Sequence, residues 1–343
     1  MPQPSKRAAN ARPAAMVDVA KLSGVSQKTV SRVVNGEPHV SSEVQAKVLA
    51  AIAILNFRPN SAARALASAR TRTIGFVYTG SALFGPSAMA VGVERAARNA
   101  GYTIAVVHTR DGTPGSVRVA FDDLIGRGVD GIVVSEPADD LRPDDLPTNG
   151  IPVLSLDMNA AVDTDWIMVG ADDRSGARQA TEHLIELGHR SISHIAGPQG
   201  WATSQNRILG WRDALTEAGL QIPEPLRGDW SAASGFAAGE RLASTGVTAI
   251  LSANDDMAIG AIHAIEVSGR TVPQDVSVIG IDDIPLAAYL HAPLTTIRQD
   301  FDKIAHEGMS RLLDVIEGRP LETRRFAVPT QLVVRTTTGA PIR

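Results

Sequence analysis

The apolar positions near the N-terminus repeat every three to four residues, which is the period of helices that bury one face. They predict three short helices, at 17–22, 27–34 and 42–55. Gly24 can end the first helix in a left-handed conformation, and the hydroxyl of Ser26 can cap the second. This pattern predicts a small all-α domain over residues 16–58.

From Thr73 onward the pattern changes to short β-branched runs that alternate with amphipathic helical stretches. Strands are expected at 74–78, 103–107, 131–134, 152–156, 191–197, 249–253, 276–282 and 331–335. Helices are expected up to residue 99, up to residue 124, and over 174–187, 204–218, 234–244, 257–268 and 300–317. Strand–helix alternation makes parallel sheets with right-handed crossovers. Because one small sheet cannot hold so many strands, we expect an α/β body of two parallel-sheet lobes over residues 73–343.

Polar residues stand where several of these strands end. Asp157, Asn254 and Asp282 each lie at the end of an expected strand or directly after it. Ligands of open parallel sheets bind beyond the carboxyl ends of the strands. The pattern therefore predicts a ligand site in a cleft between the two lobes.

The composition excludes several classes of protein. There is no cysteine among the 343 residues, so disulfides, zinc-thiolate sites and cysteine nucleophiles are excluded. Residues 1–15 are rich in proline, alanine and arginine, and we expect a disordered tail there rather than a secretory signal. No apolar run has membrane-spanning length. These features favour a cytoplasmic protein without a membrane partner.

Charge is distributed unevenly along the chain, although the formal net charge of the whole is only −4. Residues 1–72 hold 11 Lys and Arg against 3 Asp and Glu, whereas residues 73–343 hold 22 against 34. A basic front joined to an acidic body indicates that only the front contacts a polyanion. A basic disordered tail would give the same imbalance, so charge alone does not identify a nucleic-acid-binding domain.

The segment VDVAKLSGVSQKTVSRVVNG, residues 17–36, has the chemistry of a helix-turn-helix. Ala20 and Gly24 allow two helices to approach closely at the turn, and the valines that follow supply a small core. The second helix presents a polar, positive face suited to base edges and phosphates. The segment resembles the opening of the lactose-repressor (LacI/GalR) family of transcription repressors.

This resemblance implies specific contacts with DNA. Gln27, Lys28 and Arg32 would read much of the operator, while Ser26, Thr29, Ser31 and Asn35 would hold phosphates. The member that gives the family its name has Tyr-Gln in place of Gln27-Lys28. We therefore do not expect this chain to recognise the operator sequence of that member. A solvated helix face with incidental polar residues is the alternative.

Residues 59–72 resemble the family's hinge through the string PNSAARALA. Asn60 can cap a helix over 61–67, but so short a helix rarely persists alone, so it should form only against a partner helix and DNA. The resemblance implies that Leu66 wedges into the minor groove and kinks the DNA. Asn60, Ala63 and Leu66 are accordingly predicted to contact DNA. The alternative is a plain linker with Leu66 packed on the body.

The body carries the same resemblance in the strings GDWSAASGF (228–236), ANDDMAIGA (253–261) and PLTTIRQDF (293–301). It implies a two-lobed, periplasmic-binding-protein-like body that binds an effector and dimerises. The resemblance further implies a homodimer on a near-palindromic double-stranded operator, in which the helix-turn-helix domain of each protomer binds one half-site. Only a short segment follows Thr338, without the leucine-rich tail that makes the name-giving member a tetramer, so we expect a dimer.

The resemblance also implies a ligand pocket. Its members would be the polar residues Asp157, Arg207, Asn254, Asp282 and Gln299, the aromatic face of Trp230, and an apolar wall of Leu83, Pro86, Met89 and Phe301. Carboxylates, an amide and a guanidinium around an aromatic ring suit a polyhydroxylated sugar. Local roles are the alternative: the acids and Asn254 could cap turns, Trp230 could lie in the core, and Arg207 could pair with a surface acid.

Three pocket positions depart from the name-giving member. Ser135, Ala171 and Trp201 stand where that protein has Asn, Phe and Ser. Trp201 could fill the space that Ala171 vacates, or it could reshape the pocket for a different glycoside.

Together these inferences predict a nucleoid-associated DNA-binding transcriptional repressor that a small sugar, a glycoside such as a β-galactoside, releases from its operator. A purine-like corepressor is the alternative effector, and a sugar-binding transport receptor is the alternative class. The acidic pairs at 172–173, 255–256 and 282–283 would suit a glycosidase or a metal site, but such pairs more often cap helices or accept from hydroxyls. No HExxH spacing, phosphate loop or GxSxG elbow occurs. We therefore expect no enzyme activity, no cofactor and no metal.

Overall fold

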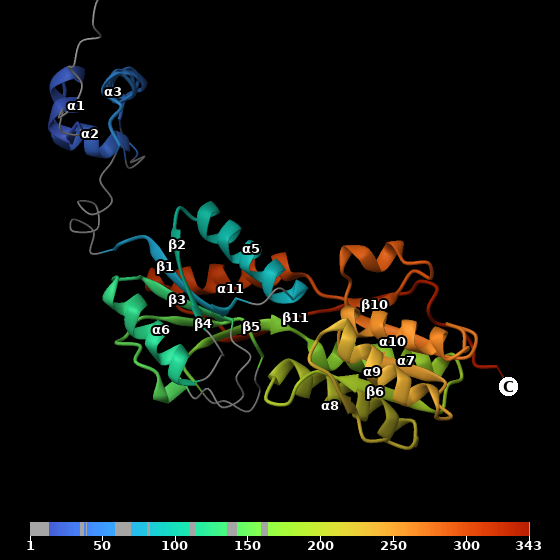
Figure 1. The fold of residues 1–343 in the computed structure, drawn as a ribbon. Coiled ribbons are helices and arrows are strands. Elements are labelled where there is room, and N and C mark those ends of the chain that lie inside the picture. The colour runs from blue at the N-terminus through green and yellow to red at the C-terminus, as the bar shows by residue number, and fades with distance from the viewer. Residues whose placement is uncertain are drawn as a thin grey trace, which may run out of the picture. The chain divides into compact units, whose positions relative to one another are not determined.

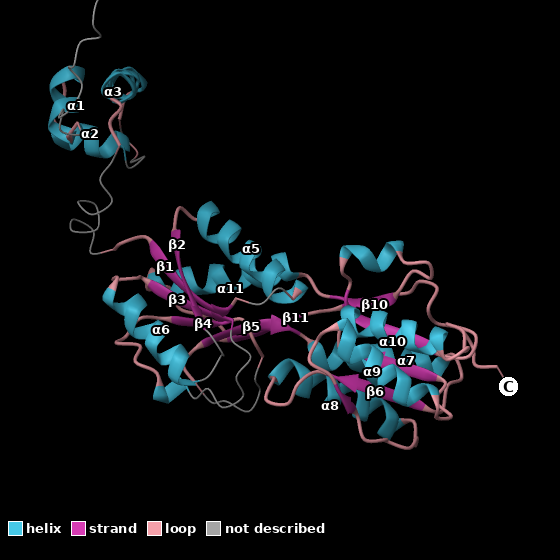
Figure 2. Ribbon diagram, viewed as in Figure 1, coloured by secondary structure: helices cyan, strands magenta, loops and turns pink. Residues whose placement is uncertain are grey.

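The computed structural model describes residues 14–34, 38, 40–58, 70–80, 83–109, 114–135, 143–158 and 164–342. The chain forms two compact units, Met1–Thr71 and Arg72–Arg343. Their helices and strands are drawn in Figure 1 and Figure 2. Most of the predicted N-terminal tail and the whole predicted hinge helix lie outside the described residues.

Three helices make the first unit: α1 (Met16–Ser23), α2 (Gln27–Val34) and α3 (Ser42–Leu55). Gly24 ends α1 with a φ of +69°, a conformation that costs glycine little. The buried core between the helices consists of Val19, Ala20, Val30, Val48, Ala51 and Phe57. The predicted helix-turn-helix fold is confirmed.

The first lobe of the body is built on a six-stranded parallel sheet in the order β11-β5-β4-β3-β1-β2. Its strands are β1 (Thr73–Thr79), β2 (Thr103–Thr109), β3 (Gly131–Ser135), β4 (Val153–Ser155), β5 (Ile167–Ala171) and β11 (Arg325–Val328), with a 3-10 turn at Pro143–Asp145. Its helices are α5 (Phe84–Asn99), α6 (Pro114–Gly126) and α11 (Phe301–Ile316). Separate apolar clusters lie under α5 and α11 on one face and under α6 on the other (Figure 1).

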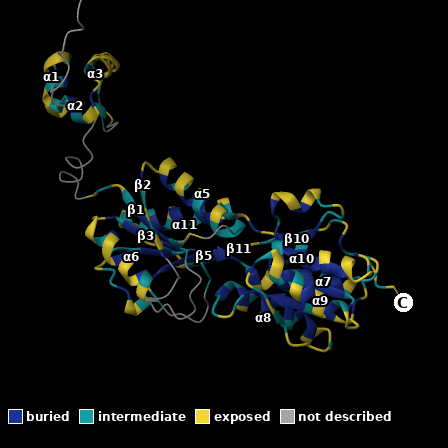
Figure 3. Cartoon of the chain, viewed as in Figure 1, coloured by how far each residue is buried: buried dark blue, intermediate teal, exposed yellow. Residues whose placement is uncertain are grey.

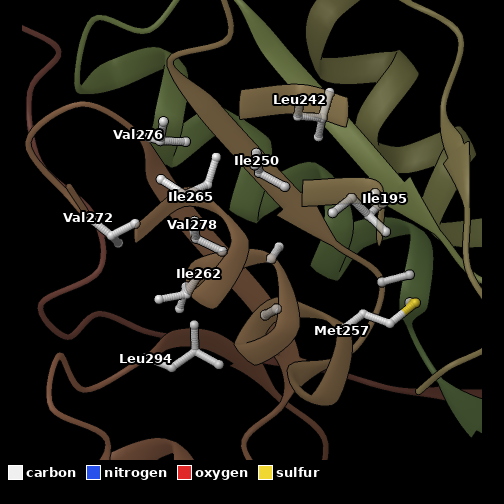
Figure 4. Close-up of a cluster of buried hydrophobic side chains, with 14 of the residues drawn as sticks. Ile195, Leu242, Ile250, Met257, Ile262, Ile265, Val272, Val276, Val278 and Leu294 are labelled. Atoms are coloured by element: carbon white, nitrogen blue, oxygen red, sulfur yellow. The ribbon is translucent and has the colours of Figure 1, made fainter. Parts of the chain in front are cut away.

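The second lobe has a six-stranded sheet in the order β12-β10-β9-β8-β6-β7. Its strands are β6 (Ile192–Ala196), β7 (Leu226–Arg227), β8 (Ala249–Ser252), β9 (Ser277–Asp282), β10 (Thr295–Arg298) and β12 (Gln331–Val333), with a 3-10 turn at Pro285–Tyr289. Its helices are α7 (Asp173–Glu186), α8 (Ala202–Glu217), α9 (Ala232–Ala243) and α10 (Asp255–Val267). The cluster under α9 and α10 is drawn in Figure 4, and a second cluster lies under α7 and α8.

Helices on both faces bury the central strands from both sides, as in β3, β8 and β9, which is why these strands read as continuous apolar runs. Figure 3 shows this burial, with exposed residues on the outer faces of the helices. In the described part of the body the chain passes between the lobes three times, after β5, after β10 and after β11. Each lobe is therefore completed by segments that are distant in the sequence.

The structure confirms the two-lobed α/β body and adds elements that the sequence pattern did not predict. Strands β5, β7, β10 and β11 were not expected, because none of them shows the alternation of apolar and polar residues that identifies a half-buried strand. The second sheet is also not wholly parallel, since β12 pairs antiparallel with β10. An antiparallel edge strand is common on such sheets.

Candidate functional site

The second helix of the first unit presents a polar face. Gln27, Lys28 and Arg32 are exposed, whereas Val30 is fully buried against α1 and α3. Because residues four apart lie on the same side of a helix, Lys28 and Arg32 share one face. This arrangement places two cations and an amide on the exposed surface of α2.

Hydroxyl groups order the start of this helix. Ser26 Oγ accepts the backbone N–H of Thr29 at 3.1 Å and lies 2.9 Å from Thr29 Oγ1. Ser26 therefore has the local capping role that its position predicted. Its predicted phosphate contact, and those of Thr29 and Ser31, stay predictions. Asn35, Asn60, Ala63 and Leu66 lie outside the described residues.

A cavity of about 130 Å³ lies between the two lobes of the body. All ten residues predicted to bind a ligand line it. The first lobe contributes Leu83, Pro86, Met89, Asp157 and Phe301, and the second lobe with its connection to α11 contributes Arg207, Trp230, Asn254, Asp282 and Gln299. A cavity that holds one water needs only ~10–15 Å³, so this one can admit a small organic molecule.

The cavity wall also includes residues that the sequence did not single out for binding. They are Phe84, Gly85, Leu156, Gly170, Asp173, Thr203 and Ile304. The three positions noted as departures, Ser135, Ala171 and Trp201, line the cavity as well.

Arg207 and Asp173 form an ion pair in the cavity wall. Arg207 Nε donates to Asp173 Oδ1 at 2.8 Å, and only 4% and 7% of the two residues are exposed. Arg207 Nη1 also donates to the carbonyl oxygen of Ala253. Burial raises the pKa of Asp173, and the guanidinium opposes that shift. The alternative of a surface partner for Arg207 is wrong, because its partner is buried.

Asp282 ends β9 and is the second buried carboxyl of the cavity. Gln299 Nε2 donates to its Oδ1 at 2.7 Å, while Arg207 Nη2 lies 3.9 Å from the same oxygen. Burial raises the pKa of Asp282 well above its usual range, although the Arg207 guanidinium opposes the shift.

The turn after β9 holds Asp282 in an unfavourable backbone conformation. The φ angles of Asp282 and Asp283 are +128° and +56°, which cost free energy for residues with a Cβ. The Asp283 carboxylate accepts from Arg298 Nε at 2.6 Å and from Arg335 Nη2 at 2.5 Å. These two ion pairs stabilise the turn and direct Asp282 to the cavity.

A second buried carboxylate supports the same turn. Asp255 Oδ2 accepts the backbone N–H of Ile284 at 2.8 Å, and its Oδ1 accepts the hydroxyl of Thr296 at 2.5 Å. Burial raises the pKa of Asp255 to about 6. Of the acidic pairs, Asp255 and Asp283 therefore order this turn, while Asp172 caps α7 by accepting the N–H of Ser175.

Asn254 has a local role and also lines the cavity. Its Oδ1 accepts the N–H of Met257 and so caps α10, and its Nδ2 donates to the carbonyl oxygen of Trp230 at 3.0 Å. An amide nitrogen has two hydrogens, so the second can still donate to a ligand.

Trp230 lies against backbone on one side. A Cβ on Gly197 would be 2.2 Å from the Trp230 ring, so only glycine fits there. Trp230 itself has a φ of +74°, and its buried Nε1 has no hydrogen-bond partner in the structure. The Trp201 ring lies 5.3 Å from the Trp230 ring, with an angle of 61° between the planes.

Comparison with known proteins gives the family. A model of bacterial regulatory proteins of the lacI family matches residues 15–60, and a periplasmic binding protein-like domain matches residues 181–338. The lactose operon repressor of Escherichia coli (strain K12) is 36% identical over 335 residues, which cover 96% of this chain and 92% of that repressor. The chain belongs to the LacI family of bacterial regulatory proteins. The HTH-type transcriptional regulator CelR of Thermobifida fusca is 35% identical over 328 residues, 92% of this chain and 96% of that regulator.

Solved structures of LacI-family proteins share the fold. The Lac repressor dimer bound to operator and the anti-inducer ONPF matches with a TM-score of 0.83 at 35% identity, over 96% of this chain and all of that chain. The CelR–cellobiose complex matches with a TM-score of 0.72 at 32% identity, over 94% of this chain and 99% of that chain. The resemblance stated from the sequence is confirmed at the level of family and fold.

Proposed function

We propose that this LacI-family regulator is a sequence-specific DNA-binding transcriptional repressor that a small sugar releases from its operator. The observation that carries the proposal is the cavity between the lobes. Two buried carboxyls, a guanidinium and two amides surround a tryptophan there, a set that matches the hydroxyl groups and the C–H face of a sugar. Relatives solved with an operator and with cellobiose support both halves of the proposal.

In this proposal the regulator acts as a homodimer on a near-palindromic operator, with α2 of each protomer in one major groove. Gln27, Lys28 and Arg32 contact bases, and residues 59–72 form the hinge to the body. A sugar that contacts both walls of the cavity draws the lobes together. The change in the first lobe alters the spacing of the two hinges and lowers the affinity for DNA.

The proposal places this repressor in the cytoplasm, on the nucleoid, without a cofactor or an enzymatic reaction. The residues that the structure describes include no helix long and apolar enough to cross a membrane. The buried acids of the cavity wall already have partners, Arg207 for Asp173 and Gln299 for Asp282. Such acids suit binding of hydroxyl groups, and a β-galactoside is the narrower candidate for the effector.

The test is fluorescence anisotropy of labelled DNA from upstream of the gene, with the full-length protein at fixed salt. We expect tight binding that glycosides weaken and that purine bases leave unchanged. If purine bases strengthen binding and glycosides have no effect, the protein is a corepressor-dependent regulator. If no DNA from this region binds, the repressor proposal is wrong.

A further inference from the structure

Two tryptophan side chains of the second lobe lie next to each other in the cavity wall. Trp201 and Trp230 both line the cavity, and their ring planes meet at 61°. Trp230 is only 5% exposed and lies against Gly197. Trp201, at the start of α8, is only partly buried. The cavity wall therefore holds a deeply buried indole and a less buried one beside it.

Polar side chains of the cavity wall lie close to Trp230, the more deeply buried of the two tryptophans. The Arg207 guanidinium carbon lies 5.7 Å from the centre of the Trp230 ring, and Asn254 donates to the Trp230 carbonyl oxygen. Arg207 is also within 3.9 Å of Asp282. A sugar ring bound at this end of the cavity can thus reach these polar groups.

Small residues belong to the first-lobe side of the cavity. Ser135, Gly170 and Ala171 line it. Ala171 packs in the first lobe's own apolar cluster, whereas Trp201 packs with Trp230 on the second lobe's cluster. Trp201 therefore extends the second-lobe wall and does not join the cluster that contains Ala171.

We propose that Trp201 is the platform for a second ring, so that the effector of this regulator is a two-ring glycoside. The inference rests on the proposed function and names the class of sugar. The first ring stacks on Trp230 and bonds to the surrounding polar groups. The second ring, a sugar or an aryl aglycone, lays its face on Trp201 and buries the exposed part of the indole.

The test is isothermal titration calorimetry on the full-length protein with matched ligand pairs. The pairs are methyl β-glucoside against cellobiose and methyl β-galactoside against lactose, with the corresponding p-nitrophenyl β-glycosides as a third arm. We expect a two-ring ligand to bind at least about tenfold tighter than its one-ring counterpart, about 1.4 kcal/mol. The third arm distinguishes a second sugar from an aryl aglycone.

A Trp201→Ser variant should lose that advantage, so that the two ligands of each pair bind with affinities within about twofold of each other. A Trp201→Phe variant, which keeps a ring, should retain most of the advantage. The subsite is wrong if methyl glycosides bind as tightly as two-ring ligands, or if Trp201→Ser weakens both classes equally. If wild type binds purine bases and none of the glycosides, the sugar effector itself is wrong.

Discussion

At the scale of single residues, Asp282 is the buried acid through which we expect effector binding to depend on pH. Its carboxyl is buried in the cavity wall, and burial raises its pKa well above the usual range. Hydroxyl groups of a bound sugar would donate to the ionised form and lower that pKa again. Binding should therefore release a proton.

We expect the affinity for the effector to rise with pH until Asp282 is ionised in the free protein, and to fall as pH decreases through the pKa of the free form. Calorimetry between about pH 5 and 8, in buffers of different ionisation enthalpy, measures both the affinity and the proton release. An Asp282→Asn variant cannot ionise and should bind more weakly with little pH dependence. Proton uptake by the wild type would contradict this assignment.

The sequence placed ten residues at the cavity because family motifs carry them, and the structure brings all ten together. It missed Asp173, which stands beside a helix cap and looked like part of that cap. The pairing of Asp173 with Arg207, 34 positions away along the chain, depends on how α7 packs against α8. Such a contact is a property of the tertiary structure and has no local pattern in the sequence.

At the scale of elements, the turn between β9 and the 3-10 turn Pro285–Tyr289 positions Asp282 in the cavity wall. Asp283→Asn keeps a side chain that tolerates a positive φ but removes the ion pairs with Arg298 and Arg335. We expect about tenfold weaker effector binding, ~1.4 kcal/mol, with operator binding unchanged in the absence of effector.

Asp213→Asn is the matched control for this variant, because it breaks a 2.6 Å ion pair with Arg174 at residues that do not line the cavity. Calorimetry should show wild-type effector affinity for it. Equal losses in the two variants would show that the turn has no special role.

Helix α2 carries the second prediction at this scale. Arg32→Ala should weaken operator binding by about 1–3 kcal/mol and weaken binding to scrambled DNA less, because a base contact is sequence-specific. Lys47→Ala removes the same charge from α3, where Lys47 pairs with the exposed Glu43 at 2.8 Å.

Fluorescence anisotropy with operator DNA and with scrambled DNA compares Arg32→Ala with Lys47→Ala. A similar loss on operator and scrambled DNA for Arg32→Ala would identify Arg32 as a phosphate contact.

Helices and strands could be predicted from the sequence where apolar residues recur regularly over several helical turns or strand residues. Helices α2 and α3 have the bounds that the pattern predicted. Strand β5 was missed because its five buried residues show no alternation, and β11 because its four residues show none either. Their place in the first sheet depends on their partners, which are distant in the sequence.

At the scale of the whole molecule, DNA binding and effector binding belong to different units of one chain. If both bias the same equilibrium, the coupling is reciprocal: operator DNA must weaken effector binding by the factor by which effector weakens operator binding. Titrating the effector with and without saturating operator measures one factor, and titrating the operator measures the other. Unequal factors would show that the two titrations do not report one shared equilibrium.

The three passages of the chain between the lobes have a consequence for protein synthesis. The helix-turn-helix is complete once Phe57 has been made, but the first lobe still lacks α11 and β11, and the second lobe lacks β12 until Val333. At roughly 5–20 residues per second, the ribosome needs on the order of 15–60 s to extend the chain from Phe57 to Val333. During that interval each nascent chain has a folded helix-turn-helix and an incomplete body. On the proposed function, a message cut short before α11 would therefore encode a DNA-binding domain that the effector cannot control.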